Sequence, residues 1–81
     1  MSRIGIIESV VNNTVNLVGY GEYLGNEIER DEEFDIDIEI PVVMLDNGNK
    51  IKLNQYYWAE EESIKAELET YELKGYSIKT I

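Results

Sequence analysis

The sequence predicts a small α+β domain in which one helix covers a bent antiparallel sheet, or a partly open barrel similar to an SH3 fold. Apolar residues alternate with polar ones through much of the chain, as they do along half-buried strands. One segment near the C-terminus, residues 58–74, changes to a helical period of about 3.6. The chain has 81 residues, which leaves room for one hydrophobic core and therefore for a single domain over residues 1–81. We expect the order β-β-β-β-α-β.

The N-terminal quarter has the pattern of a hairpin. β-branched residues dominate from 3 to 11 and from 14 to 18. Between them lie Asn12 and Asn13, which tolerate the left-handed backbone of a tight turn. Three glycines then fall between positions 19 and 25, which predicts a break in regular structure, and residues 27–33 are predicted to form a charged loop.

The clearest strand signal lies in residues 34–40. Apolar side chains alternate there with acidic ones, in the order Phe34, Asp35, Ile36, Asp37, Ile38, Glu39, Ile40. This pattern predicts a strand with one buried face and one acidic face. Pro41 cannot donate a main-chain hydrogen bond, so we expect the strand to break there, adding a further strand, or to lie at an edge.

A second hairpin is predicted at Asn47-Gly48, a dipeptide that favours a two-residue turn. A turn of that length pairs Met44 with Ile51, and it places Lys50 and Lys52 on the opposite face. The helix of residues 58–74 is expected to end at Gly75, and residues 76–81 form a last strand. The expected core consists of Ile4, Ile6, Val15, Leu17, Ile36, Ile38, Met44, Ile51, Leu53, Ile64 and Leu68.

Composition excludes several kinds of chemistry. The chain has no cysteine and no histidine, which removes disulfides, thiolate catalysis, His-based acid–base catalysis and His- or Cys-ligated metals. A domain this small rarely builds the deep cleft that paired carboxylates need for catalysis, so we expect no enzyme activity and no cofactor. No apolar run reaches the roughly 20 residues that span a bilayer. The simplest interpretation is a soluble cytoplasmic protein.

Net charge is the strongest functional signal. Seventeen acidic residues against seven basic ones give a charge of −10, which repels nucleic acid and anionic membranes and attracts basic surfaces. The alternative is that the charge only maintains solubility. Eight of the acidic residues lie between positions 27 and 39, beside a single arginine.

The acidic stretch is the candidate partner-binding site. Its residues are Glu29, Asp31, Glu32, Glu33, Asp35, Asp37 and Glu39. Three of them, Asp35, Asp37 and Glu39, are predicted to share one strand face, with no Lys or Arg between them to relieve their repulsion. Such a row can imitate a nucleic-acid backbone or be an ordinary solvated face. A flat strand does not wrap an ion, so we expect no metal site.

Aromatic residues form a second set of candidate contacts, with ligands or with partners. They are Tyr20, Tyr23, Tyr56, Tyr57 and Trp58. Consecutive aromatics can stack on rings, although they more often anchor a helix to a sheet. The glycines at 19, 21 and 25 can suggest a phosphate loop, but no helix is predicted directly after them, so a tight crossing between strands is favoured.

Three segments resemble a group of short uncharacterised proteins from bacteriophages and prophage-carrying bacteria. They are Gly19-Tyr20-Gly21-Glu22-Tyr23-Leu24-Gly25-Asn26-Glu27, Leu45-Asp46-Asn47-Gly48, and Trp58 before an acidic helix. The group's pattern is G-Y-G-x-Y-x-G-D-E, an L-D-x-G-K hairpin and an aromatic-Trp-Gly-Pro-Glu helix start. This chain departs from it at Ala59, which replaces the glycine, and it lacks the group's proline and hairpin cysteines. The resemblance implies a phage accessory protein, a class whose small acidic members often block host defence proteins such as CRISPR effectors.

The sequence thus favours a non-catalytic inhibitor that mimics nucleic acid and binds a basic, nucleic-acid-binding surface of a host defence protein. A protein that sequesters a nucleotide signal is the alternative, and a virion structural or assembly protein is a third. An unpaired edge at residues 34–40 also predicts a homodimer, unless the charges of that strand keep the chain monomeric.

Overall fold

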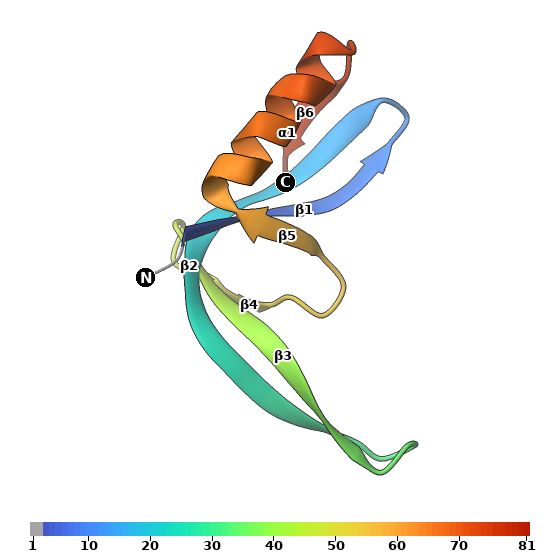
Figure 1. The fold of residues 1–81 in the computed structure, drawn as a ribbon, viewed down its shortest axis with the longest axis vertical. Coiled ribbons are helices and arrows are strands. Elements are labelled where there is room, and N and C mark those ends of the chain that lie inside the picture. Colours follow the sequence, from blue (N-terminus) through green and yellow to red (C-terminus); the bar gives the residue numbers. More distant parts are fainter. Residues whose placement is uncertain (1–2) are drawn as a thin grey trace.

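A computed structural model describes residues 3–81 and contains six strands and one helix (Figure 1). The elements are β1 (Arg3–Val11), β2 (Thr14–Asp31), β3 (Ile36–Leu45), β4 (Lys50–Lys52), β5 (Tyr57–Glu60), α1 (Glu61–Leu73) and β6 (Ser77–Thr80). The strands form a bent, mainly antiparallel sheet in the order β4-β3-β2-β1-β5, and β6 pairs with β2 in parallel. The predicted α+β class is therefore confirmed. The SH3-like barrel is not confirmed, because β5 adds a strand and the strand order differs.

Strand β2 is the longest strand and connects the part of the sheet that contains β1 with the part that contains β3. Its first half pairs with β1 and its second half pairs with β3, over a total of 18 residues. The expected break at residues 19–25 was wrong, because the strand bends there without ending. The register shifts leave Val18 and Leu24 without partners, next to Gly19 (φ 142°) and Gly25 (φ 113°). Unpaired residues of this kind are β-bulges, which bend a strand while preserving the ladder on either side.

The core consists of two clusters on opposite faces of the sheet. The helix-side cluster packs α1 against the sheet and contains Ile7, Val15, Leu17, Ile64 and Leu68. The second cluster brings β3 and the chain after β4 against β1, and contains Ile4, Ile6, Val43, Leu45 and Leu53. Successive strand residues point to opposite faces, which is why Ile6 and Ile7 are both buried. We call these elements, without residues 27–39, the body.

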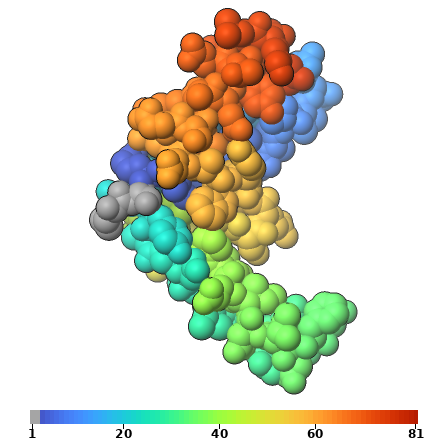
Figure 2. Space-filling model, viewed as in Figure 1, coloured from blue at the N-terminus to red at the C-terminus, as the bar shows by residue number. Residues whose placement is uncertain are grey.

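The outer part of β2 and β3 projects from the body as a two-stranded hairpin (Figures 1 and 2). We call residues 27–39 the arm. No side chain of the arm is buried. The arm contributes to the elongated shape of the chain, which measures 45 × 29 × 19 Å. The charged loop predicted at 27–33 was wrong for most of its length, because β2 continues to Asp31.

Three of the expected core residues lie elsewhere. Ile36 and Ile38 are exposed because they belong to the arm, and Met44 is exposed because the second hairpin has a different register from the one predicted. The Leu45 N–H donates to the Asn49 carbonyl, so the loop has three residues and Met44 pairs with Lys50. Gly48, with φ 92°, supplies the left-handed residue that a three-residue loop requires.

The helix is shorter than predicted at its N-terminal end. Residues 57–60 pair with β1 as strand β5 before the helix begins at Glu61. The predicted end is confirmed, because Gly75 has φ 91° and the Tyr76 N–H donates to the Tyr71 carbonyl, a pattern that terminates helices. Within residues 3–81, α1 is the only helix, and it is neither long nor apolar enough to cross a membrane.

Candidate functional site

The tip of the arm is fixed by local hydrogen bonds. Asp31 and Ile36 form the last pair of the β2–β3 ladder, which leaves residues 32–35 as the turn. The Asp31 Oδ1 accepts hydrogen bonds from the Glu33 N–H (3.0 Å) and the Phe34 N–H (3.3 Å). Asp35 closes the turn with a left-handed backbone, φ 56°, which aspartate tolerates better than most residues. The tip thus presents Phe34 and its acidic neighbours in a defined geometry.

Both faces of the arm combine acidic and apolar residues. Paired residues share a face, so Ile36 and Ile38 lie with Asp31 and Glu29 of β2. The other face carries Asp37 opposite Arg30 and Glu39 opposite Ile28. The predicted grouping holds for Asp37 and Glu39 only. Asp35 lies in the turn and outside the strand alternation.

Ion pairs relieve part of the repulsion in the arm, contrary to the expectation that no basic residue does so. Arg30 contacts Asp35 and also Asp37, the latter at 3.2 Å. These partners lie on or near the neighbouring strand, which the sequence order alone did not indicate.

At the base of the arm, two lysines of β4 approach carboxylates of β2. Lys52 contacts Glu29 and lies 3.5 Å from Glu27, and the Lys50 amine lies 3.8 Å from Glu27. The hydrogen bond that Lys52 donates to the Glu29 carboxylate is the main reason why the pKa of Lys52 is raised. All of these groups are substantially exposed, so each pair contributes little stability.

The remaining arm carboxylates face solvent. Within residues 3–81, Asp31, Glu32, Glu33 and Glu39 have no basic group within 4.0 Å. With eight carboxylates and one arginine, the arm holds the densest negative charge of the chain. The candidate partner-binding residues are therefore brought together on one projecting element, although they do not form a single flat row.

Exposed apolar side chains lie among these charges, and the sequence-based prediction missed them. Phe34 is 68% exposed, Ile28 is 66% exposed and Ile36 is 51% exposed. A single exposed apolar side chain is ordinary, whereas several on one projecting element indicate a contact surface. The alternation along residues 34–40 predicted a buried face. It could not show that no other segment among residues 3–81 packs on the apolar side chains of that face. One available signal was Ile28, an isolated apolar residue between Glu27 and Glu29.

The candidate aromatic residues are not assembled into one site. Tyr23 stacks on Trp58, with ring centroids 6.4 Å apart and planes 9° apart. Tyr20 lies under the amine of Lys65 on the helix side, while Tyr56 packs against the cluster on the opposite face. Their separation follows from the strand alternation described above.

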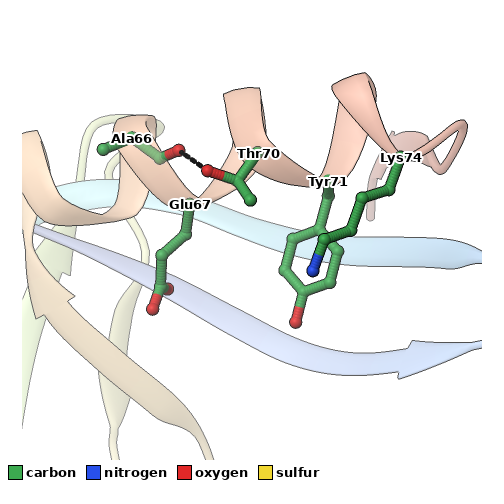
Figure 3. A pocket seen from close by; sticks show the side chains of 5 residues that line it. All are labelled: Ala66, Glu67, Thr70, Tyr71 and Lys74. Carbon is green, nitrogen blue, oxygen red and sulfur yellow. Dashed lines mark hydrogen bonds between the residues drawn. The ribbon is translucent and has the colours of Figure 1, made fainter.

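In two hollows beside the helix, the hydroxyl groups of Thr70 and Tyr57 already donate hydrogen bonds within the protein. One, of about 300 Å³, is lined by Ala66, Glu67, Thr70, Tyr71 and Lys74 (Figure 3). Its Thr70 hydroxyl donates to the Ala66 carbonyl at 3.0 Å, so that group is already satisfied. An adjacent hollow includes Tyr57, whose hydroxyl donates to Glu67 at 2.9 Å, a bond that raises the pKa of the tyrosine. A raised pKa makes a tyrosine a poorer nucleophile at neutral pH.

Two other potential ligand sites are not supported by the fold. The glycines at 19, 21 and 25 lie inside strand β2, so no loop at the start of a helix is available to hold a phosphate. Among residues 3–81, no three carboxylates are grouped closely enough to hold a metal ion.

Comparisons with protein-family models, with curated proteins and with solved structures find no match for this chain.

Proposed function

We propose that this protein is a non-catalytic inhibitor that docks its acidic arm on a basic, nucleic-acid-binding surface of another protein. The observation that carries the proposal is the arm itself: a preorganised hairpin that projects from the body and has eight carboxylates between positions 27 and 39. Surfaces that bind nucleic acid present Lys and Arg at phosphate spacing. Arginine binds a carboxylate with two hydrogen bonds much as it binds a phosphate.

The shape of the arm supports insertion into a groove. A two-stranded ribbon is narrow enough to enter the major groove of duplex DNA, and a hairpin of that width suits a channel built to hold a strand or duplex. The exposed apolar side chains of Phe34, Ile28 and Ile36 then bury surface that charge alone leaves in water. Charge provides fast, salt-dependent encounter, and the apolar contacts slow dissociation.

The resemblance to phage proteins extends the proposal to the identity of the partner. It favours as the partner a host defence protein, such as a CRISPR effector, in the cytoplasm of a bacterium that carries the phage. An inhibitor of this kind competes with nucleic acid for one surface and needs no chemistry of its own.

Capture followed by competition tests the proposal. The immobilised protein is incubated with nuclease-treated bacterial lysate, and bound proteins are eluted with duplex DNA or RNA. The variant D35K/D37K/E39K should retain none of the DNA-elutable proteins, because like-charge contacts cost a complex several kcal/mol, about 3 or more here. The matched control is E62K/E69K/E72K, an equal charge change on exposed positions of α1.

The outcomes separate clearly. Loss of binding in the arm variant with retention in the helix variant supports the proposal. The proposal is contradicted if the arm variant still captures the same proteins, or if duplex DNA or RNA does not elute the proteins that the unmodified chain captures.

A nucleotide-sequestering protein is the second candidate, and the exposed Trp58 ring stacked on Tyr23 favours it. A purine can extend such a stack. Native mass spectrometry of freshly purified protein should then show a bound nucleotide. Absence of any added mass, together with no thermal stabilisation across cyclic and linear nucleotides, removes this candidate.

A further inference from the structure

We infer that the partner adds a β-strand to the open edge of β3 at residues 36–40, and that this strand alternates basic and apolar side chains. The inference rests on the proposed function, which it deepens by defining how the acidic arm is recognised. Strand addition to an exposed sheet edge is a common mode of peptide recognition, with main-chain hydrogen bonds giving affinity and alternate side chains giving specificity.

The hydrogen bonds of β3 show which of its main-chain N–H and C=O groups point away from β2 and are free to pair with another strand. The Leu45 N–H donates to the Asn49 carbonyl (2.8 Å), and the Pro41 carbonyl accepts from the Leu53 N–H (2.9 Å). Odd-numbered residues of β3 therefore direct their main-chain groups toward the side of β4. Because this direction alternates along a strand, Asp37 and Glu39 point to the same side. There, among the described residues, no strand covers them, since β4 pairs only with positions 42–44.

The side chains at this edge define the sequence of the incoming strand. A neighbouring strand places its own side chains alternately on the same two faces as those of β3. On one face they meet the carboxylates of Asp37 and Glu39, which favour Lys or Arg. On the other face they meet Ile36 and Ile38, which are 51% and 38% exposed and favour an apolar residue.

Strand β4 is an internal precedent for this mode. It pairs with the next section of the same β3 edge, and its sequence is Lys-Ile-Lys. Lys50 and Lys52 reach carboxylates of β2, while Ile51 packs against the buried cluster of the body. The edge of β3 thus already accepts a strand in which basic and apolar residues alternate, and the arm extends that edge. Lys50 and Lys52 pair with Met44 and Val42, on the face of Ile36 and Ile38, so β4 supports the alternation and leaves the face of the basic residues to the charges of Asp37 and Glu39.

A second copy of this chain is the alternative occupant. Antiparallel pairing of two β3 edges brings Asp37 and Glu39 of one copy close to those of the other, and like charges placed opposite each other destabilise a sheet. The charge of the arm therefore favours a basic partner strand. The homodimer predicted from the sequence is tested by the same variants.

The direct probe is a synthetic peptide in which arginine and valine alternate over the length of the open edge. The control peptide has the same composition, with its arginines and valines in separate blocks. We expect the alternating peptide to bind at least about tenfold more tightly. In NMR-detected hydrogen exchange, it should slow the amides of Asp37 and Glu39 more than those of their even-numbered neighbours.

Two variants separate the main-chain contribution from charge. Glu39→Pro removes one outward N–H and one carboxylate, and leaves the β2–β3 ladder intact, as Pro41 does two positions later. Glu39→Gln removes the carboxylate and keeps the N–H. The alternating peptide should bind Glu39→Pro about tenfold more weakly than Glu39→Gln, with both variants giving the same α1 and body chemical shifts as the unmodified chain.

Equal binding of the two peptides, or of the two variants, overturns strand addition. Strand addition can fail while the proposed function stands. This is the result if the two peptides or the two variants bind equally and D35K/D37K/E39K still fails to capture the proteins that nucleic acid elutes. The proposed function itself fails if D35K/D37K/E39K still captures those proteins. A dimer in sedimentation equilibrium that becomes a monomer in Glu39→Pro also overturns the inference, because the edge is then occupied by a second copy.

Discussion

The body and the arm are built from the same kind of alternating strand, and they differ in what covers the apolar side chains. In β1, Ile4 and Ile6 are buried under β3 and Leu53, and Ile7 is buried under the helix. In the arm, Ile36 and Ile38 alternate in the same way and remain exposed. Strand β2 runs through both regions, with residues 14–26 in the body and residues 27–31 in the arm. Alternation therefore shows which side chains can be covered, while the topology decides whether this chain or a partner covers them.

Charge follows the same division. Eight of the chain's 17 acidic residues lie in the arm, where burial is lowest. In the body, the main charged feature is structural: Arg3 lies between Asp46 (2.7 Å) and Glu61 (3.1 Å) and ties the β3–β4 turn to the start of the helix. The body holds the fold together, and on our account the arm supplies the contact with a partner.

The largest expected effect is on stability when a buried side chain is truncated. Ile64→Ala removes a fully buried side chain from the helix-side cluster and should lower the free energy of unfolding by about 2–5 kcal/mol. The matched arm variant Ile38→Ala, at an exposed position, should change it by less than about 1 kcal/mol. Urea unfolding followed by circular dichroism measures both. Similar losses in the two variants mean that the arm packs on the body in solution.

A close approach of the helix to β1 gives the next largest effect. A Cβ atom at Gly5 would lie 2.8–2.9 Å from side-chain carbons of Ile64, closer than carbon atoms can approach without a shift. Gly5→Ala should therefore destabilise the body by about 1–3 kcal/mol, the usual consequence of overpacking. Thermal unfolding checks it. An unchanged or raised melting temperature shows that Ile64 lies farther from Gly5 than these distances.

The ion pairs of Arg3 predict a smaller, pH-dependent effect. Hydrogen bonds from Arg3 lower the pKa of Asp46 and of Glu61. A carboxylate whose pKa is lowered on folding stabilises the fold above its ordinary pKa, about 4, and that contribution disappears as pH falls through the folded value. The difference in stability between the unmodified chain and Arg3→Leu should be present at pH 7 and narrow below about pH 4. A difference that is constant with pH assigns the role of Arg3 to packing.

Most of the secondary structure could be predicted from local patterns. The first hairpin, the end of the helix at Gly75 and the alternating strand after Phe34 follow from turn residues, a C-terminal glycine and period-2 alternation. Such signals lie within a few residues and need no knowledge of distant contacts. Seven residues of the expected core lie in the two clusters, because a short strand or helix has few ways to bury its apolar face; examples are Ile6, Val15 and Ile64.

The features that could not be predicted depend on distant contacts. A glycine can end a strand or allow it to continue through a bulge, and at Gly19 and Gly25 the pairing of β2 with β1 and β3 decides for the bulge. Gly21 is needed because β3 lies so close that a Cβ atom there would be 2.2 Å from the Met44 carbonyl oxygen. Residues 57–60 join the sheet because β1 offers them an edge, which the helical pattern that follows them obscures. For the candidate site, the charge of the arm was evident from the sequence. The contacts of Arg30 and the exposure of Phe34 required the pairing of β2 with β3.

The division of labour between body and arm is tested most directly by hydrogen exchange on the intact chain, free and with polyarginine as a basic probe. In the free chain, the amides of the helix and of β1 should be protected and the open edges of the arm should exchange fast, because local stability follows burial. Adding polyarginine should slow exchange within residues 27–39 and leave α1 unchanged. Protection that appears on α1 or β5 instead, or that spreads evenly over the chain, contradicts the assignment of binding to the arm.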